Sequence, residues 1–552
     1  MRRTVSLLIA LPLLAFPAAA HAGAGLSRPL PYRAAVPTTV TVGLVGRPEN
    51  LNPLLFTSQS AADILSAISD GLLRYAPTNW PGNDQHYAWR PDLLASMPVL
   101  TVQGPPGPQA AVTIVYRLRP GLRWSDGAPL TAQDIRFTWQ AVMQAANGAY
   151  QAGYNQITAI DTPSATTAVV HLKGTYAAWQ TLFSALLPYH VLHGRITNIA
   201  RDRAYNLRPL ATGPYAVAYD RGGRIVLRRN PFYQGQDGPK GQVERIVVRC
   251  YKDSSGLLAA LRSHQVTIAD GLELSAQTLH RLQRAGWQVK SVPGLVFDQF
   301  TFNLYSPTTQ QLSVRRAFYL ALNRQAISQR LFGGRWEIAT TDQAPFSWAF
   351  SPKVPVVRQN IAAARRLLQA SGWQRGPGGY FQQGGQPLTL RVSMTRSPMH
   401  KALIEAVMRQ EALAGIRVVP SYAPAGALFG PVGLLAQGHY QVAEFGLVDG
   451  VDPNDAALFS SGAGNRYAQG VDFSGYQNAL VNALLQDALV RMHTAPRARD
   501  YRQVQMAVYR DLPMVPLFFQ AVETVYNPRL LSRITVNDLG GSLWTANRWH
   551  VR

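Results

Sequence analysis

Cysteine is almost absent from the sequence. One cysteine occurs among 552 residues, so no disulfide bond can form within the chain. Cys250 lies in the alternating segment 244–253, "ERIVVRCYKD", and no histidine or second cysteine stands beside it in sequence. We therefore expect a buried structural thiol rather than a reactive one.

Acidic residues are also scarce. The chain has 30 Asp and Glu against 53 Lys and Arg, which gives a formal net charge of +23. A strongly basic chain can bind nucleic acid. Here, however, the basic residues are nearly all arginine and are spread along the whole chain, which favours dispersed surface charge over a binding footprint. We expect no nucleic-acid partner.

Catalytic motifs are missing as well. The sequence has no G-x-S-x-G elbow and no phosphate-binding P-loop, and its glycine-rich stretches at 376–380 and 462–470 are typical of turns. His190 and His193 lie three residues apart and could share a helix face, but one pair without a third ligand favours a structural role. We expect no enzyme, no catalytic residue, no metal and no cofactor.

Long apolar runs are confined to the start of the chain. Arg2 and Arg3 precede an apolar stretch at 5–16, and "AHA" at 20–22 has the small-residue pattern of a cleavage site, so residues 1–22 are predicted to be a cleavable secretory signal. The next candidate, 423–436, is broken by proline and glycine. We expect a soluble periplasmic protein without a lipid anchor, because Cys250 lies far from the cleavage site.

The remaining sequence mixes strand and helix patterns, with 47% apolar residues and no long linker. Alternation predicts strands that include 38–45, 111–119, 167–172, 243–250, 388–393 and 441–447. Helical spacing predicts helices that include 132–144, 254–262, 313–331, 400–414 and 497–511. This pattern indicates an α/β protein whose lobes are joined by several short crossings.

One stretch identifies a family. Residues 118–139, "LRPGLRWSDGAPLTAQDIRFTW", resemble a motif of the dipeptide- and oligopeptide-binding proteins of ABC importers, bacterial solute-binding protein family 5. Further blocks follow in the family's order, among them "ISDGLLRY" at 68–75, "LLPYHVLHG" at 186–194, "ATGPYAVAYDRGGRIVLRRNPFY" at 211–233, "VRRAFYLALNRQAI" at 314–327 and "YRQVQMAVYRDLPMVPLFF" at 501–519. Within 118–139 itself we expect scaffold, with Trp124 and Trp139 packed and Asp126-Gly127 forming the turn.

The resemblance implies a two-lobed periplasmic-binding-protein-like fold of class II type, with an extra domain inserted in the first lobe. It places domain I at 38–72, 207–292 and 497–552, domain II at 73–206 and domain III at 293–496. It also implies a monomer that captures a short peptide or other small solute by hinge closure between the lobes. The partners are then the transmembrane permease of an ABC importer and its cytoplasmic ATPase subunits.

The resemblance also implies a binding site. Asp449 matches the acidic residue that holds a peptide's ammonium group, and Gly446, Leu447 and Val448 match the strand that pairs with the peptide backbone. Arg396 is the candidate for the ligand's carboxylate, and Arg47 could line the same crevice. Peptide-binding relatives often have tryptophan where this chain has Gly446, which leaves a nickel chelate, haem, an opine, a sugar or an anionic compound open as the solute.

Overall fold

The computed structural model describes residues 38–552, except 57, 78–86, 150, 152, 236–240, 430–432, 449, 461–471, 538 and 540. The predicted secretory signal therefore lies outside the described residues. None of the helices in the described part of the chain combines the length and apolar character needed to cross a membrane.

The first lobe, as we use the term, is built on three parallel strands. β1 (Thr39–Val45) lies between β10 (Arg245–Tyr251) and β11 (Ile268–Asp270), and the antiparallel strands β9 (Arg224–Arg229) and β8 (Tyr215–Arg221) follow at the outer edge. The helices are α1 (Gln59–Ile68), α5 (Ser254–Arg262) and α6 (Ala276–Arg284). α1 and α5 follow the carboxyl ends of β1 and β10, which directs their N-termini toward that edge of the sheet.

The second lobe repeats this arrangement. β17 (Thr389–Met394) lies between β18 (Arg417–Tyr422) and β19 (Val442–Val448), and all three are parallel. Its helices include α8 (Leu312–Ala321), α9 (Arg324–Phe332), α10 (Ile361–Ala370) and α11 (Pro398–Ala414). The single helix predicted over 313–331 is wrong. Asn323 interrupts it, because its side chain accepts a hydrogen bond from the Ala326 N–H at 2.9 Å and so caps a second helix.

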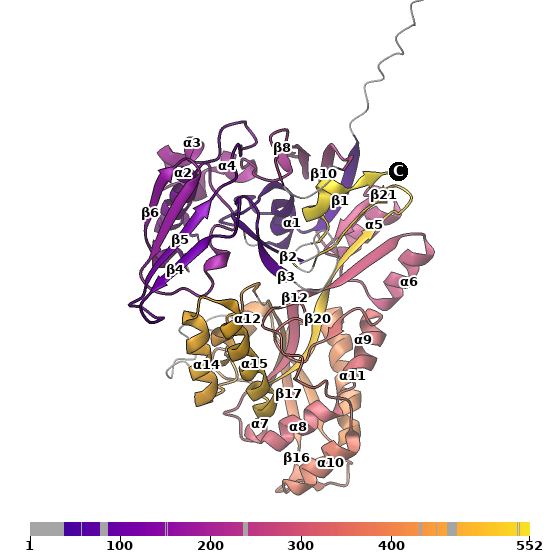
Figure 1. The fold of residues 1–552 in the computed structure, drawn as a ribbon. Coiled ribbons are helices and arrows are strands. Elements are labelled where there is room, and N and C mark those ends of the chain that lie inside the picture. Colours follow the sequence, from indigo (N-terminus) through magenta and orange to yellow (C-terminus); the bar gives the residue numbers. More distant parts are fainter. Residues whose placement is uncertain are drawn as a thin grey trace, which may run out of the picture. The chain divides into compact units, whose positions relative to one another are not determined.

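Two long strands join the lobes (Figure 1). β12 (Gln288–Phe302) and β20 (Met514–Tyr526) pair with each other, with β11 on the first-lobe side and with β19 on the second-lobe side. Their register shifts between Pro293 and Phe297, where the ladder is interrupted. A bulged two-strand connection bends more easily than a continuous sheet, so this is where a hinge is expected.

A separate four-stranded sheet lies between β2 (Leu73–Pro77) and β8 in the chain. Its order is β4 (Val99–Gln103), β5 (Ala111–Arg117), β7 (Thr167–Leu172) and β6 (Ile157–Ser164), and α2 (Ala132–Val142) packs on it. Trp124 is buried in the core of this sheet and Trp139 packs against that core, as predicted. Gly127 adopts the predicted turn at φ +91°, a conformation that favours glycine.

The C-terminal helices α14 (Ala479–Val490) and α15 (Thr494–Asp511) pack on each other. They share a core with Phe297 of β12 and Phe519 of β20. α15 belongs by prediction to domain I, and these contacts place it against the joining strands. The proposed boundaries of domains I, II and III stay a prediction.

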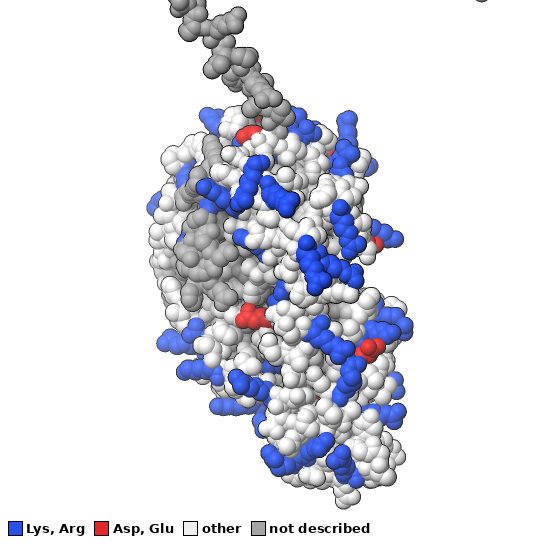
Figure 2. Space-filling model, turned by 90° about the vertical axis from the view of Figure 1, so that its right-hand side faces the viewer, with Lys and Arg blue, Asp and Glu red and all other residues white. Residues whose placement is uncertain are grey.

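On one face of the molecule positive charge is dispersed rather than gathered in a stripe (Figure 2). On the face drawn in Figure 2, Lys and Arg side chains are scattered with few Asp or Glu between them. This arrangement on that face is typical of general surface charge and offers no continuous track for a nucleic-acid backbone.

Candidate functional site

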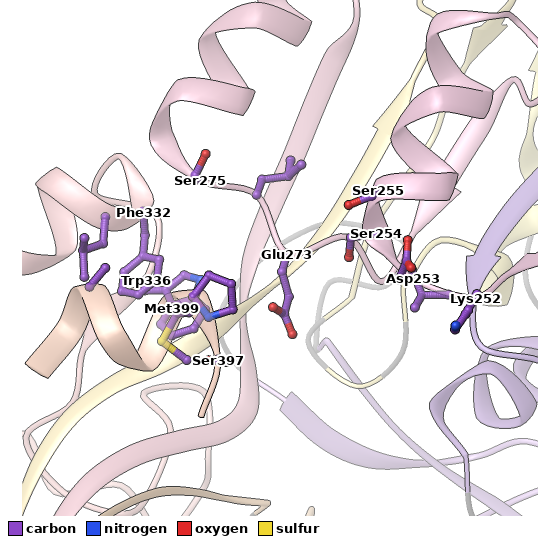
Figure 3. A pocket seen from close by; sticks show the side chains of 15 residues that line it. Lys252, Asp253, Ser254, Ser255, Glu273, Ser275, Phe332, Trp336, Ser397 and Met399 are labelled. Atoms are coloured by element: carbon purple, nitrogen blue, oxygen red, sulfur yellow. The ribbon is translucent and has the colours of Figure 1, made fainter. Parts of the chain in front are cut away.

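A cavity of about 640 Å³ lies between the two lobes (Figure 3). Its wall consists of Val45, residues 252–255, residues 273–275, Leu331, Phe332, Trp336, residues 397–399 and Ala402. In the first lobe these segments lie at the carboxyl ends of β1, β10 and β11. In the second lobe residues 397–399 follow β17, and Leu331 and Phe332 end α9. The carboxyl ends of parallel strands are where open α/β sheets bind ligands, so the fold itself selects this cavity.

Two helix N-termini reach the cavity. α5 starts after Asp253, whose carboxylate accepts a hydrogen bond from the Gly256 N–H at 2.9 Å. α11 starts after Ser397, whose hydroxyl accepts from the His400 N–H at 3.0 Å. Helix N-termini carry a partial positive charge, and Asp253 offsets it at α5. The α11 end therefore remains favourable for an anionic group of a ligand.

The carboxyl end of β19 leaves one backbone edge open. β12 pairs with β19 along its whole length, from Val442 to Val448, whereas β17 pairs only with Val442 and Ala443. In the described part of the chain no strand pairs with the second edge of residues 444–448. An open edge of this kind accepts an extended chain by β-augmentation.

The predicted strand residues lie on this open segment. Gly446, Leu447 and Val448 are the last residues of β19, and Val448 is 74% exposed. Asp449 lies outside the described residues, so its predicted ammonium contact stays a prediction. A side chain at Gly446 would place its Cβ 2.8 Å from Oδ1 of Asp298, so a larger residue fits here only if Asp298 moves.

The two predicted arginines have other contacts. The Arg396 guanidinium lies 4.7 Å from the centre of the Tyr422 ring, one residue before the cavity wall at Ser397. Arg47 donates a hydrogen bond to Asp220 at 2.6 Å and is absent from the wall, although Val45 two residues earlier is part of it. Arg396 is therefore the better placed of the two, and both roles stay predictions.

Other reactive side chains do not converge on the cavity. His190 contacts Asp126 at 2.8 Å, whereas His193 contacts the Tyr189 carbonyl at 2.9 Å. Among the described residues, no three His, Cys, Asp or Glu side chains are arranged to hold a metal ion. Cys250 is half-buried beside the first-lobe core, and burial raises the pKa of its thiol to about 11, which disfavours the reactive thiolate.

Sequence patterns missed three acidic residues near the cavity: Asp298 on β12, Glu444 on β19 and Glu273 in the wall. β12 itself was not predicted, because Pro293-Gly294 in its middle is typical of a turn. The available signal was weak. Asp298 and Glu444 each interrupt an apolar strand pattern, where a charged residue is unusual.

Residues 110–469, more than half of the chain, match the family model described as bacterial extracellular solute-binding proteins, family 5. The chain belongs to this family. Family 5 is a family of binding proteins. The predicted family is thereby confirmed.

Family 5 proteins of known sequence and structure resemble the chain over different lengths. A Brucella ovis protein, named provisionally as an ABC transporter peptide-binding protein, is 28% identical over 313 residues, which cover 54% of this chain and 55% of that protein. The match thus spans about half the length of this relative.

Two solved structures match nearly the whole family 5 chain. NikZ from Campylobacter jejuni, in complex with Ni(L-His), has a TM-score of 0.70 at 20% identity and covers 93% of this chain and 99% of its own. AppA from Bacillus subtilis, in complex with a nonapeptide, has a TM-score of 0.66 at 19% identity and covers 94% and 100%. These likenesses confirm the predicted two-lobed fold and leave the solute open.

Proposed function

We propose that this family 5 protein is the substrate-binding component of an ABC importer and captures short peptides between its lobes. It works outside the cytoplasm, after export by the signal at residues 1–22. It delivers the peptide to a transmembrane permease that cytoplasmic ATPase subunits drive. The open edge of residues 444–448 carries the proposal, because it offers backbone groups to any extended peptide irrespective of its sequence.

The peptide's two ends have distinct partners in this proposal. The N-terminal ammonium binds Asp449, directly after the open segment of β19. The C-terminal carboxylate lies near the N-terminus of α11, where Arg396 supplies a fixed positive charge. Bending at the register shift between Pro293 and Phe297 then closes the lobes and excludes water from the bound peptide.

Native mass spectrometry of the protein purified from its own envelope tests this function. The mass is compared before and after denaturation, and the released species is fragmented. We expect a mixture of short peptides with free N-termini. Asp449→Asn should abolish this bound population, whereas Asp487→Asn, an exposed acid on α14, should leave it unchanged.

A second solute class is distinguished by the same spectrum. NikZ, with the same fold, was solved with Ni(L-His). A single bound mass with a metal isotope pattern would replace the peptide by a chelate and keep the binding function. A protein that is empty as purified and gives no thermal shift with either peptides or chelates would contradict both.

A further inference from the structure

Two acidic side chains lie side by side under the cavity. In the register of β12 and β19, Asp298 is opposite Gly446 and Phe300 is opposite Glu444. Residues opposite each other, or two positions apart along a strand, point to the same face of a sheet. Asp298 and Glu444 are therefore diagonal neighbours on one face.

Both carboxylates are buried without a full set of partners. Asp298 is 2% exposed and Glu444 is fully buried. Gln520 donates a hydrogen bond to Oδ1 of Asp298 at 2.9 Å, but Oδ2 has no hydrogen bond, and neither oxygen of Glu444 has one. The nearest described base is His400, whose Nε2 lies 3.7 Å from Glu444. Burying ionised carboxylates without hydrogen-bond partners lowers the stability of the fold unless a cation lies beside them.

Burial also raises the pKa values of both carboxyl groups. It raises the pKa of Glu444 well above its usual range, and the neighbouring Asp298 raises it further. Burial likewise raises the pKa of Asp298, and Glu273 adds to the rise. A cation held beside the two acids would favour their ionised forms and so lower both pKa values.

This pair lies close to the cavity wall, although neither acid is part of the wall. Phe518, directly opposite Asp298 in the register, packs edge-on against Phe332 and against Trp336, two members of the cavity wall. Glu273, another wall residue, is close enough to raise the pKa of Asp298. Gly446, which is exposed, lies beside Asp298: a Cβ there would come within 2.8 Å of Oδ1 of Asp298.

The approach to these carboxylates is apolar. Leu331, Phe332, Trp336 and Met399 form one side of the wall, and Phe332 and Trp336 stack with ring centres 3.7 Å apart. An apolar wall beside buried carboxylates fits a chain of methylene groups with a cationic head. We propose that the cavity takes a ligand carrying a lysine-like or arginine-like side chain, whose head binds between Asp298, Glu444 and Glu273. This inference rests on the proposed binding function.

Calorimetric titration with three probes tests the inference. The probes are the tripeptide Ala-Lys-Ala, its uncharged analogue Ala-norleucine-Ala and the diamine cadaverine. Both peptides have the same termini, so a difference between them isolates the side-chain charge. A charged hydrogen bond is worth about 1.5–3 kcal/mol, so we expect Ala-Lys-Ala to bind about tenfold to a hundredfold more tightly.

Variants of the protein test whether the preference for Ala-Lys-Ala comes from the proposed acidic site. Asp298→Asn should remove it, and Gly446→Ala should weaken it by displacing the Asp298 carboxylate. Glu411→Gln is the matched control: Glu411 is also fully buried with both oxygens unpaired, but it lies in the part of α11 beyond the cavity wall. This control should keep the full preference, and thermal unfolding of each variant verifies that it is folded.

The outcomes separate this inference from the proposed function. Equal binding of the two peptides would overturn the cationic site and leave peptide capture intact. Cadaverine binding that Asp298→Asn abolishes, with neither peptide bound, would support the cationic site and contradict peptide capture. No binding of any probe would overturn both. A preference that persists in Asp298→Asn and in Gly446→Ala would also overturn the site.

Discussion

Asp452 and Asp298 are both buried acids, yet only Asp452 has a cation against it. Arg497 donates two hydrogen bonds to Asp452, at 2.5 and 2.8 Å, and its guanidinium lies over the Trp348 ring. Asp298 receives one amide hydrogen bond and keeps one oxygen unpaired. The Asp452 charge is neutralised by Arg497 within the chain. The Asp298 carboxylate has no such cation in the described part of the chain and, under our proposal, binds one from a ligand.

This difference separates structural from functional burial of charge. The pair of Arg497 and Asp452 holds α15 against the loop after β19, and both side chains are almost fully excluded from water. Its fixed geometry needs nothing from outside the chain. Among the described residues, Asp298 and Glu444 have no such arginine partner, so under our proposal the cost of their burial is offset only when a cationic ligand binds.

The largest expected effect comes from breaking the satisfied pair. Arg497→Met leaves Asp452 buried without a cation, which should lower the free energy of unfolding by about 3–5 kcal/mol. Urea denaturation measures the change. Asp487→Asn, which removes only the surface pair of this exposed acid with Arg491, is the control and should cost no more than about 1 kcal/mol. Equal losses in the two variants would show that the Arg497 pair is no more structural than a surface contact.

A smaller effect, of opposite sign, is expected at the unsatisfied acid. Burial raises the pKa of Asp298 from 3.8 to about 7, so over this interval the unfolded chain loses its proton first and the wild-type protein loses stability as pH rises. Asp298→Asn has no such loss. Its melting temperature relative to wild type should therefore increase between about pH 4 and pH 7 and then level off.

Thermal unfolding across this pH range checks the prediction, and Asp487→Asn serves as the exposed reference. A difference that stays constant with pH would mean that the Asp298 charge is already compensated. That result would mean that Asp298, like Asp452, has its charge compensated within the chain, and the contrast between the two residues would disappear.

The smallest expected effect on stability concerns an exposed charge. Arg396 contributes through its contact with the Tyr422 ring, so Arg396→Ala should lower the free energy of unfolding by only about 0.5–1 kcal/mol. Its effect on peptide affinity should be larger if it binds the carboxylate, and amidated peptides should then bind wild type and variant equally. Equal losses with free and amidated peptides would assign Arg396 a packing role instead.

Local patterns predicted much of the fold. The strand at Thr167–Leu172 and the helix at Ser254–Arg262 have the predicted bounds, because alternation and an Asp253 cap specify them within a few residues. The capping box of Thr131 and Asp134 likewise marks the start of α2. Family blocks then supplied the two-lobed arrangement, which such local signals do not contain.

The site was less accessible to prediction. Asp298 and Glu444 are more than 140 positions apart in the sequence, and only the pairing of β12 with β19 brings them together. The sequence also does not show which buried acids lack a basic partner. The chain has many arginines, but long-range contacts decide which acid each arginine pairs with. Arg497, for example, reaches back to Asp452 rather than forward to the cavity.

The open edge of β19 has a further consequence, for self-association. An unpaired strand edge can join the same edge of a second copy, which is how soluble sheets start to aggregate. Two copies of this chain, each with a formal charge of +23, repel each other at a distance. Salt shortens this repulsion, to about 10 Å at roughly 0.1 M. Protein without a bound peptide should accordingly be least stable in storage at high ionic strength, and an occupied edge should keep it monodisperse.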